Sequence, residues 1–546
     1  MLEPAPGSAS TPPRRRTAAP DGFNTARRPQ STVIEDALGD RSLVVVSNRE
    51  PYVHEYADGE PAVQRPAGGL VTALDGVVAE TGGTWVAWGS GDADFDPAVA
   101  PEGEVRMPPE ARANSADDRP GYTLARLDLP RRLVENYYYG YSNQVLWPIC
   151  HLEADPVTVD AKFWPAYREA NRRFAERAVA ADPDVVWFQD YHLGLAPRFV
   201  REQRPDARLV QFWHVPWPTP EFFEICPQAT ELLRGLLGND AVGFHLERYA
   251  DNFRDCVARF VPDAEVTDAG IRYDGRLVET YASPIGVDTE RVADNARSDA
   301  AAHYWERVVD RYDLDPERPV VLGVDRLDYT KGVVERLDAL AHLLETTPEL
   351  AGEFTYVQKG TRTREGIPAY RRYYDAVRDR IAELDRVHGT EDWTPALYIE
   401  DDVDDRELAG LYRNADVAVV SSRRDGMNLV AKEFVAAQGR PFPNAGLAQT
   451  EGLDNPARDR APGALVLSRF VGAAESLCPA ALPVNPYDVS AFAETIRDAL
   501  EMGEPERHDR MASLQASVRG EDIDAWLATQ LDVLAGRERV VAADDD

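Results

Sequence analysis

The segment RDGMNLVAKE at residues 424–433 follows the apolar run 417–420 and leads into a helical pattern. This order places Asp425 and Gly426 at a strand-to-helix junction, where free backbone N–H groups and the positive end of a helix dipole point at a ligand. The glycine lets a ligand approach the backbone, Asp425 offers an acceptor for hydroxyls, and Glu433 lies two turns along the helix. A lone Asp-Gly is more typical of a helix cap. With companion motifs, the pattern favours a site for a sugar nucleotide.

Polar residues also follow apolar runs elsewhere in the chain. The segments are LVVVSNR at 43–49, VVWFQDYH at 185–192, LVQFWHVPWPTPE at 209–221 and PVVLGVDRLDYTKG at 319–332. Residues 333–344 then have the apolar spacing of a helix with one buried face. Strand-like and helix-like segments that alternate in this way predict an α/β fold with parallel sheets, which bind ligands beyond the carboxyl ends of their strands.

Length and charge limit the classes of function. The chain has 546 residues, too many for one hydrophobic core. Lys and Arg total 60 against 94 Asp and Glu, and the formal net charge of -34 argues against nucleic-acid or anionic-membrane partners. A phosphate site stays compatible, because a few local cations decide it. Such acidity, with Arg well ahead of Lys, is typical of halophilic proteins, in which salt screens the self-repulsion.

The cysteines and the apolar segments indicate a cytoplasmic protein. No segment approaches the roughly 20 apolar residues of a membrane span. The cysteines are far apart, without metal-ligand or redox spacing, and we expect buried thiols in a reducing compartment; they are Cys150, Cys226, Cys256 and Cys478.

Composition and turn signals divide the chain. YASPIGVDTERV at 281–292 closes one series of strands with a Pro-Ile-Gly turn, and a new series opens at Pro319. Residues 439–463 have the Pro, Gly and Asn content of a surface loop. The expected parts are a disordered leader at 1–40, an N-terminal domain at 41–287, a C-terminal domain at 288–520, and at 521–546 a C-terminal helix, returning to the N-terminal domain, with an acidic tail.

These segments together resemble the trehalose-6-phosphate synthases over about residues 41–535. The motifs that carry the resemblance are SNR at 47–49, AGGL at 67–70, YYYGYSNQVLWP at 137–148, QDYHL at 189–193, HVPWPTPE at 214–221, GFH at 243–245, SPIGVD at 283–288, DRLDYTKG at 325–332, RDGMNLVAKE at 424–433, LVLSRFVGAAESL at 465–477 and VNPYD at 484–488. The resemblance implies a retaining glycosyltransferase of the GT-B arrangement, with two Rossmann-like domains facing across a cleft.

The resemblance also implies a donor site for a nucleotide-glucose. Arg326 and Lys331 would hold the donor diphosphate and offset the charge of the leaving group, so we expect no metal and no cofactor. The other implied donor residues are Gly68 and Gly69 for the diphosphate, His214 and Asp425 for the glucose, the backbone of Gly426, Met427, Asn428, Leu429 and Val430 for sugar and phosphates, and Glu433 for the ribose.

Glucose 6-phosphate is the implied acceptor. The residues that would cradle it are Arg49, Tyr138, Trp147, Asp190 and an arginine after the strand FTYVQ. The segment KGTRTREG at 359–366 departs from the family pattern there; counting back from Tyr370 selects Arg364, with Arg362 as the alternative. A planar guanidinium suits phosphate because it donates two hydrogen bonds at once. A second departure, Glu50, puts an acid beside this phosphate site.

Family resemblance favours attack from the side of the leaving group, with a donor phosphate oxygen accepting the proton of the acceptor hydroxyl. No side chain is then a nucleophile, and catalysis depends on positioning and charge. Asp190 would orient the acceptor and His214 the donor glucose. The D-x-D at residues 92–94 matches a metal motif of another glycosyltransferase architecture, but we assign it to a solvated loop.

Other interpretations stay open from the sequence alone. The acceptor could be glycerol 3-phosphate, giving a glucosylglycerol-phosphate synthase, or the chain could be an inactive regulatory homologue that has lost its donor ligands. UDP-glucose is the favoured donor, with GDP- and ADP-glucose as alternatives. Trehalose 6-phosphate leads to an osmolyte. No nucleic-acid or membrane partner is expected, and a homo-oligomer stays open.

Overall fold

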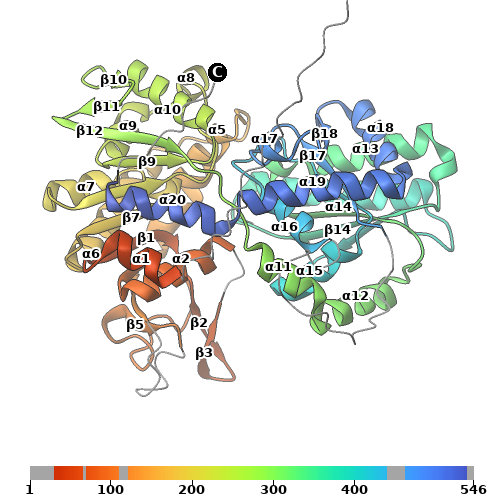
Figure 1. Ribbon diagram of the computed structural model, residues 1–546, viewed down its shortest axis with the longest axis horizontal. Coiled ribbons are helices and arrows are strands. Elements are labelled where there is room, and N and C mark those ends of the chain that lie inside the picture. The colour runs from red at the N-terminus through yellow and green to blue at the C-terminus, as the bar shows by residue number, and fades with distance from the viewer. Residues whose placement is uncertain (1–29, 66–68, 110–120, 439–460, 538–546) are drawn as a thin grey trace, which may run out of the picture.

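The structure is a computed structural model that describes residues 30–65, 69–109, 121–438 and 461–537. Its described strands form two large sheets, one in each half of the chain, and a hairpin (Figure 1). The first sheet contains β1 (Leu43–Arg49), β4 (Thr84–Trp88), β5 (Glu104–Met107), β6 (Tyr122–Leu127), β7 (Val185–Gln189), β8 (Arg208–Phe212), β9 (Ala241–Phe244), β10 (Glu265–Thr267), β11 (Gly270–Tyr273) and β12 (Arg276–Ala282). The second contains β13 (Val320–Arg326), β14 (Thr355–Thr361), β15 (Ala396–Ile399), β16 (Val417–Val420), β17 (Ala464–Ser468) and β18 (Leu482–Val484), and the hairpin is β2 (Val53–Ala57) with β3 (Glu60–Gln64).

The first sheet has the order β10-β11-β12-β9-β8-β7-β1-β4-β6-β5, and its pairs from β12 to β6 are parallel. Every residue of β7 and β9 is buried, because helices cover both faces of the sheet. The helices of this half are α1 (Gln30–Leu38), α2 (Gly69–Thr81), α4 (Arg131–Asn136), α5 (Trp147–Cys150), α6 (Phe163–Ala180), α7 (Ala196–Gln203), α8 (Pro220–Phe223), α9 (Ala229–Leu236) and α10 (Glu247–Phe260).

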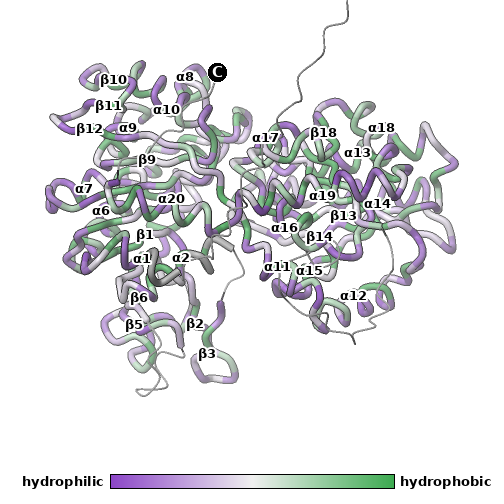
Figure 2. Tube along the Cα trace, in the orientation of Figure 1, coloured by the Kyte–Doolittle hydropathy of each residue, from purple (hydrophilic) through white to green (hydrophobic). Residues whose placement is uncertain are grey.

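The second sheet has the order β15-β14-β13-β16-β17-β18 and is parallel throughout. Figure 2 shows hydrophobic strands inside and hydrophilic helix faces outside. The remaining helices are α11 (Thr289–Arg297), α12 (Asp299–Tyr312), α13 (Val333–Thr346), α14 (Pro368–His388), α15 (Asp405–Asn414), α16 (Leu429–Ala437), α17 (Ala474–Leu477), α18 (Val489–Glu501), α19 (Glu504–Gly520) and α20 (Ile523–Ala535). The predicted α/β fold with parallel sheets is confirmed.

The chain crosses between the two halves at residues 283–288 and again between α19 and α20. After the second crossing, α20 lies over the first sheet (Figure 1), where Trp526 stacks on Trp187 at 5.8 Å between ring centroids. The two crossings touch each other: a Cβ added to Gly286 would lie 1.9 Å from the carbonyl oxygen of Glu521, so a larger residue would not fit. We keep the domain boundaries at 287 and 520 as a proposal.

A buried lysine ties the crossings to α16. Nζ of Lys432, whose side chain is 0% exposed, donates to the Ile285 carbonyl at 3.0 Å and to the Glu521 carboxylate at 3.0 Å. Burial lowers the pKa of Lys432, while Glu521 opposes that shift. The helix that begins in the RDGMNLVAKE motif is therefore fixed to both crossings between the halves.

The structure differs from the expected leader at residues 30–38, which form α1. Ile34 and Leu38 are buried in the core of the first half, and α1 contacts α20. The partner helix lies almost 500 residues away, so local composition could not indicate this packing. Residues 1–29 of the leader, 439–460 of the loop and 538–546 of the tail lie outside the described residues.

No helix within the described residues is both long and apolar enough to span a membrane.

Replacing Lys432 with Met should lower the free energy of unfolding by about 2 kcal/mol, because the Ile285 carbonyl loses its donor while the side-chain volume is kept. Urea unfolding followed by circular dichroism measures the change. The matched control is Lys162→Met, since Lys162 is 66% exposed and its replacement should stay within about 0.5 kcal/mol. Equal stabilities of the two variants would contradict the proposed role of Lys432.

Candidate functional site

The carboxyl ends of the two sheets meet. A Cβ added to Gly426, just after β16, would lie 2.3 Å from the carbonyl oxygen of His214, just after β8. The Tyr249 hydroxyl donates across the same junction to the Asp425 carbonyl at 3.3 Å. Only a glycine allows the two backbones this approach, so Gly426 serves packing between the halves as well as access for a ligand.

Lys331, which follows β13, and Asp425, which follows β16, form an ion pair at the carboxyl ends of the second sheet's strands. Lys331 Nζ lies 2.5 Å from Asp425 Oδ2, and Asn428 Nδ2 donates to the same oxygen at 3.1 Å. Burial alone would raise the pKa of Asp425, but Lys331 and the hydrogen bonds lower it, so the carboxylate is charged. Arg326, at the exposed end of β13, has no ion pair among the described residues. That cation is available to an anionic ligand.

The backbone after Asp425 is shaped for a ligand. Asn428 has φ of 72° and caps α16 through a hydrogen bond from the Ala431 N–H. Met427 is buried, and its carbonyl accepts from the Ala473 N–H at 2.9 Å. Leu429 and Val430 are in the first turn of α16, where N–H groups have no intrahelical acceptor. The junction thus directs N–H groups outward, as an anion site requires.

Glu433 lies farther along α16, in a cavity of about 40 Å³ between α11, α15 and α16. Its carboxylate accepts from the Tyr412 hydroxyl at 2.8 Å. Burial raises the pKa of Glu433, partly offset by that hydrogen bond.

The first half contributes His214. Its Nε2 lies 2.9 Å from Gln189 Oε1, and burial together with the neighbouring His245 lowers its pKa well below the usual range. The ring is therefore neutral and suited to hydrogen bonding with hydroxyls. Gly69 begins α2, whereas Gly68 lies outside the described residues.

Tyr138 and Arg49, both predicted to bind the acceptor, lie together. Tyr138 sits in a π-helix, Tyr137–Leu146, of the kind often found at functional sites. Its hydroxyl accepts from Arg49 Nη2 at 2.8 Å, and its ring stacks on His192 at 5.6 Å. Burial opposes ionisation, but Arg364 and Arg49 outweigh it and lower the pKa of Tyr138.

Arg364 reaches from the second half into the aromatic residues of the first. Its guanidinium donates to Asp328 at 3.2 Å and to the Tyr191 hydroxyl at 3.3 Å, and lies 4.2 Å from the Trp147 ring centroid. Trp147 Nε1 also donates to Asp328 at 3.4 Å. Arg362, in contrast, is exposed and pairs with Glu400 at 2.5 Å. The structure brings Arg364 together with the other acceptor candidates and leaves Arg362 outside.

Asp190 has an unfavourable backbone. Its φ of 69° and ψ of 177° belong to a region that is essentially restricted to glycine. Burial raises the pKa of Asp190 to about 6, although backbone N–H groups, Arg364 and Arg326 oppose the shift. Strain and burial at one residue are typical of a functional site.

Several buried polar atoms in this region have no partner among the described residues. They are Asn48 Nδ2, Gln189 Nε2, Asp190 Oδ1, His192 Nε2 and Arg364 Nε. Such atoms are costly unless a polar ligand or water satisfies them. Their concentration beside Tyr138 and Trp147 indicates a site for a hydroxyl-rich molecule.

The environments of two acids are now defined, and one expectation is corrected. Glu50, next to Arg49 in the chain, is buried, and Arg126 Nε donates to its carboxyl group at 2.6 Å. The D-x-D at 92–94 is not simply solvated, since Asp94 is 0% exposed and pairs with the same arginine at 3.0 Å. Arg126, the partner of both acids, lies on β6, which belongs to neither motif. The spacing of residues in the sequence did not predict this contact.

Sequence reasoning assigned no role to Tyr191 or Asp328. Both lie inside the QDYHL and DRLDYTKG motifs, so motif membership was the available signal. Their contacts with Arg364 appear only once the two halves face each other.

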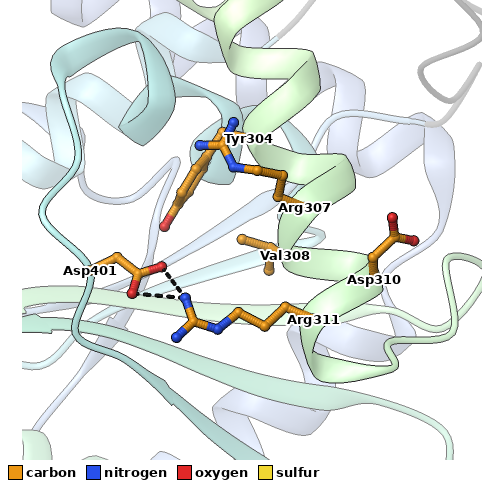
Figure 3. Close-up of a pocket in the computed structure, with 6 residues that line it drawn as sticks. All are labelled: Tyr304, Arg307, Val308, Asp310, Arg311 and Asp401. Atoms are coloured by element: carbon orange, nitrogen blue, oxygen red, sulfur yellow. Dashed lines mark hydrogen bonds and ion pairs between the residues drawn. The ribbon is translucent and has the colours of Figure 1, made fainter.

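A second, outer hollow of about 380 Å³ lies between α12 and the end of β15, and Figure 3 shows its lining. Arg311 donates to Asp401 at 2.8 Å and 3.0 Å, while Arg307 pairs with Glu407 at 2.7 Å. Its cations are neutralised by acids, and this hollow joins none of the candidate residues above.

Two facing sheets of the Rossmann type, with cations and acids where their carboxyl ends meet, are typical of the GT-B glycosyltransferases. Comparisons with known proteins agree. Glycosyltransferase family 20 matches residues 41–536, and the chain belongs to that family. A trehalose-6-phosphate synthase of Mycobacterium sp. (strain KMS) is 36% identical over 510 residues, covering 91% of this chain and 96% of that protein.

Two solved structures are similar over most of the chain. An E. coli structure bound with UDP-2-fluoro glucose is 30% identical with a TM-score of 0.76, covering 90% of this chain and 99% of that one. A UDP-forming α,α-trehalose-phosphate synthase from Burkholderia xenovorans, in complex with glucose-6-phosphate, is 29% identical with a TM-score of 0.74 and covers 90% and 99%. The chain is therefore an enzyme of a glycosyltransferase family, as the sequence predicted.

Asp190→Gly should raise the free energy of unfolding by about 2 kcal/mol while transfer is lost, because glycine relieves the backbone strain. The raised pKa adds a pH dependence: the wild type loses stability as pH rises through about 6, so the gain should be larger at about pH 8 than at about pH 5. Thermal unfolding at both pH values measures it.

The matched control is Asp313→Gly, which has φ of 50° at the end of α12 and should gain no more than about 1 kcal/mol. A destabilised Asp190→Gly variant would refute the assignment of strain to this residue.

Proposed function

We propose that this chain transfers glucose from a nucleotide-glucose, with UDP-glucose favoured, to glucose 6-phosphate with retention. The products are trehalose 6-phosphate and a nucleoside diphosphate. The observation that carries the proposal is Arg364, a cation of the second half that lies between Trp147 and Tyr191 of the first. A phosphate needs such a cation, and the unpartnered polar atoms around it suit sugar hydroxyls.

The donor would bind at the carboxyl ends of the strands in the second sheet. Arg326 and Lys331 would neutralise the charge that develops on the leaving diphosphate, and the N–H groups from Gly426 to Val430 would hold its oxygens. Asp425 and His214 would fix the glucose, and Glu433 the ribose. Gly68 and Gly69 would approach the diphosphate from the opposite half.

The acceptor would bind at the carboxyl ends of the strands in the first sheet. Arg49 and Arg364 would grip its phosphate from opposite halves, and Tyr138 and Trp147 would pack against the sugar. Asp190 would accept from an acceptor hydroxyl and aim it at the donor. A donor phosphate oxygen would take the proton, so that positioning and charge provide the catalysis.

The names of relatives support this proposal over its alternatives, since those relatives are trehalose-6-phosphate synthases. An inactive homologue would be expected to lack donor ligands, and Arg326, Lys331, Asp425 and Glu433 are all present. Phosphorylated substrates and free thiols favour a cytoplasmic enzyme.

The direct test is an assay of the purified protein in high salt. UDP-, GDP- and ADP-glucose are each combined with glucose 6-phosphate and with glycerol 3-phosphate, with a metal chelator present, and products are identified by mass. We expect trehalose 6-phosphate from UDP-glucose in the presence of the chelator. Preferred transfer to glycerol 3-phosphate, or activity that requires added magnesium or manganese, would contradict the proposal.

Arg364→Ala should raise the Michaelis constant for glucose 6-phosphate at least about tenfold, because a charge-assisted contact to the phosphate is lost. Nucleotide-glucose affinity without acceptor should change little. The matched control is Arg362→Ala on the same loop, expected to leave both constants near wild type. Loss of donor affinity with an unchanged acceptor constant would move the acceptor away from Arg364.

A further inference from the structure

Four buried ionisable side chains lie directly behind Arg49. Glu50 directly follows β1, His54 lies on β2, Asp94 in the loop after β4 and Arg126 on β6. They are 3%, 4%, 0% and 3% exposed, respectively. Charged side chains are rarely buried so completely unless they pair with one another.

Arg126 contacts the other three side chains of this cluster. Its Nε donates to Glu50 Oε2 at 2.6 Å, and its Nη2 donates to His54 Nδ1 at 2.8 Å and to the Tyr52 carbonyl at 3.0 Å. The same nitrogen lies 3.0 Å from Asp94 Oδ1.

The two carboxyl groups share one cation. Arg126 Nε lies 2.6 Å from Glu50 Oε2, and Arg126 Nη2 lies 3.0 Å from Asp94 Oδ1, with both acids buried. One arginine therefore faces two carboxyl groups, and a proton on one of them balances the charge. Asp94 also accepts from the N–H groups of Gly91 at 2.6 Å and His54 at 2.8 Å, which stabilise its charge. Although burial opposes it, interactions with the His54 side chain and backbone N–H, with Glu50 and with Arg126 lower the pKa of Asp94 to about 2, whereas burial raises the pKa of Glu50 to about 8. With neutral Glu50, the charges of Asp94 and Arg126 cancel.

Arg49 depends on this support. The Arg49 guanidinium donates to the Tyr138 hydroxyl and lies near its ring, and the Arg49 backbone sets the point from which the side chain extends. That backbone is held on one side by Ser47, whose hydroxyl donates to the Arg49 carbonyl at 2.6 Å. On the other side it is held by Glu50, whose carboxyl also accepts from the Ser90 N–H at 2.9 Å.

We propose that Glu50 is a positioning residue for the acceptor: its protonated carboxyl, bound by Arg126, fixes the backbone of Arg49 and keeps a second negative charge away from the acceptor phosphate. This inference rests on the proposed function, in which Arg49 binds that phosphate. The other ionisable groups of this cluster are Asp94, Arg126 and His54, and Arg126 contacts both carboxyl groups.

Loss of the Glu50 proton should therefore weaken acceptor binding. The wild-type Michaelis constant for glucose 6-phosphate should rise about tenfold between about pH 7 and about pH 9, where the phosphate itself is already dianionic. The constant for the nucleotide-glucose should not follow it.

Two variants remove the titration. Glu50→Gln keeps the shape of a protonated carboxyl, and Asp94→Asn leaves one carboxylate for one arginine; both should flatten the alkaline rise to less than about twofold. The matched control is Glu55→Gln, which removes an exposed acid on β2 and should keep the rise. If Glu50→Gln and Asp94→Asn both keep it, the proposal is overturned, and Tyr138 would be the titrating group.

Infrared difference spectra between about pH 7 and about pH 9 separate this result from failure of the proposed function. A protonated-carboxyl band should vanish as pH rises in the wild type and in Glu55→Gln, and be absent from Glu50→Gln, with no substrate present. Absence of the band from the wild type overturns the protonated state of Glu50. Presence of the band in a protein that does not use glucose 6-phosphate would instead reject the acceptor.

Discussion

The site depends on a buried cation shared between the two halves of the chain. Arg364 extends from the second sheet, pairs with Asp328 and lies against Trp147 and Tyr191 of the first half. A guanidinium out of water is costly unless it is paired and hydrogen bonded. Its contacts are complete only when the halves approach each other, and its Nε still has no partner among the described residues. We therefore propose that acceptor binding strengthens the same contacts that hold the two halves together.

Other features serve the same closed arrangement. Gly426 lets the junction after β16 approach the backbone of His214, and Lys432 fixes α16 to both crossings. Asp190 keeps a strained backbone and a raised pKa where the acceptor is expected. Behind Arg49, Glu50 and Asp94 balance Arg126. The strained backbone of Asp190 lowers the stability of the fold, and the packing around it offsets that loss.

The sequence predicted the fold class and the family well, because both depend on local patterns. Apolar runs that end in polar residues indicated parallel strands, and the order of motifs indicated the family. Contacts between distant strands were not predictable in this way. Nothing near Glu50 or Asp94 indicated Arg126, and nothing in the first 40 residues indicated that α1 packs against a C-terminal helix. Arg364 was selected over Arg362 by counting, and only the fold shows why they differ: one is buried between the halves and the other is exposed.

The central claim is that donor and acceptor sites are completed by one closure of the two halves. Calorimetric titration of glucose 6-phosphate into the protein, with and without saturating nucleoside diphosphate, tests it most directly. The account predicts that the diphosphate tightens glucose 6-phosphate binding by about tenfold, and that glucose 6-phosphate tightens the diphosphate by the same factor. Equal affinity in both titrations would contradict the account.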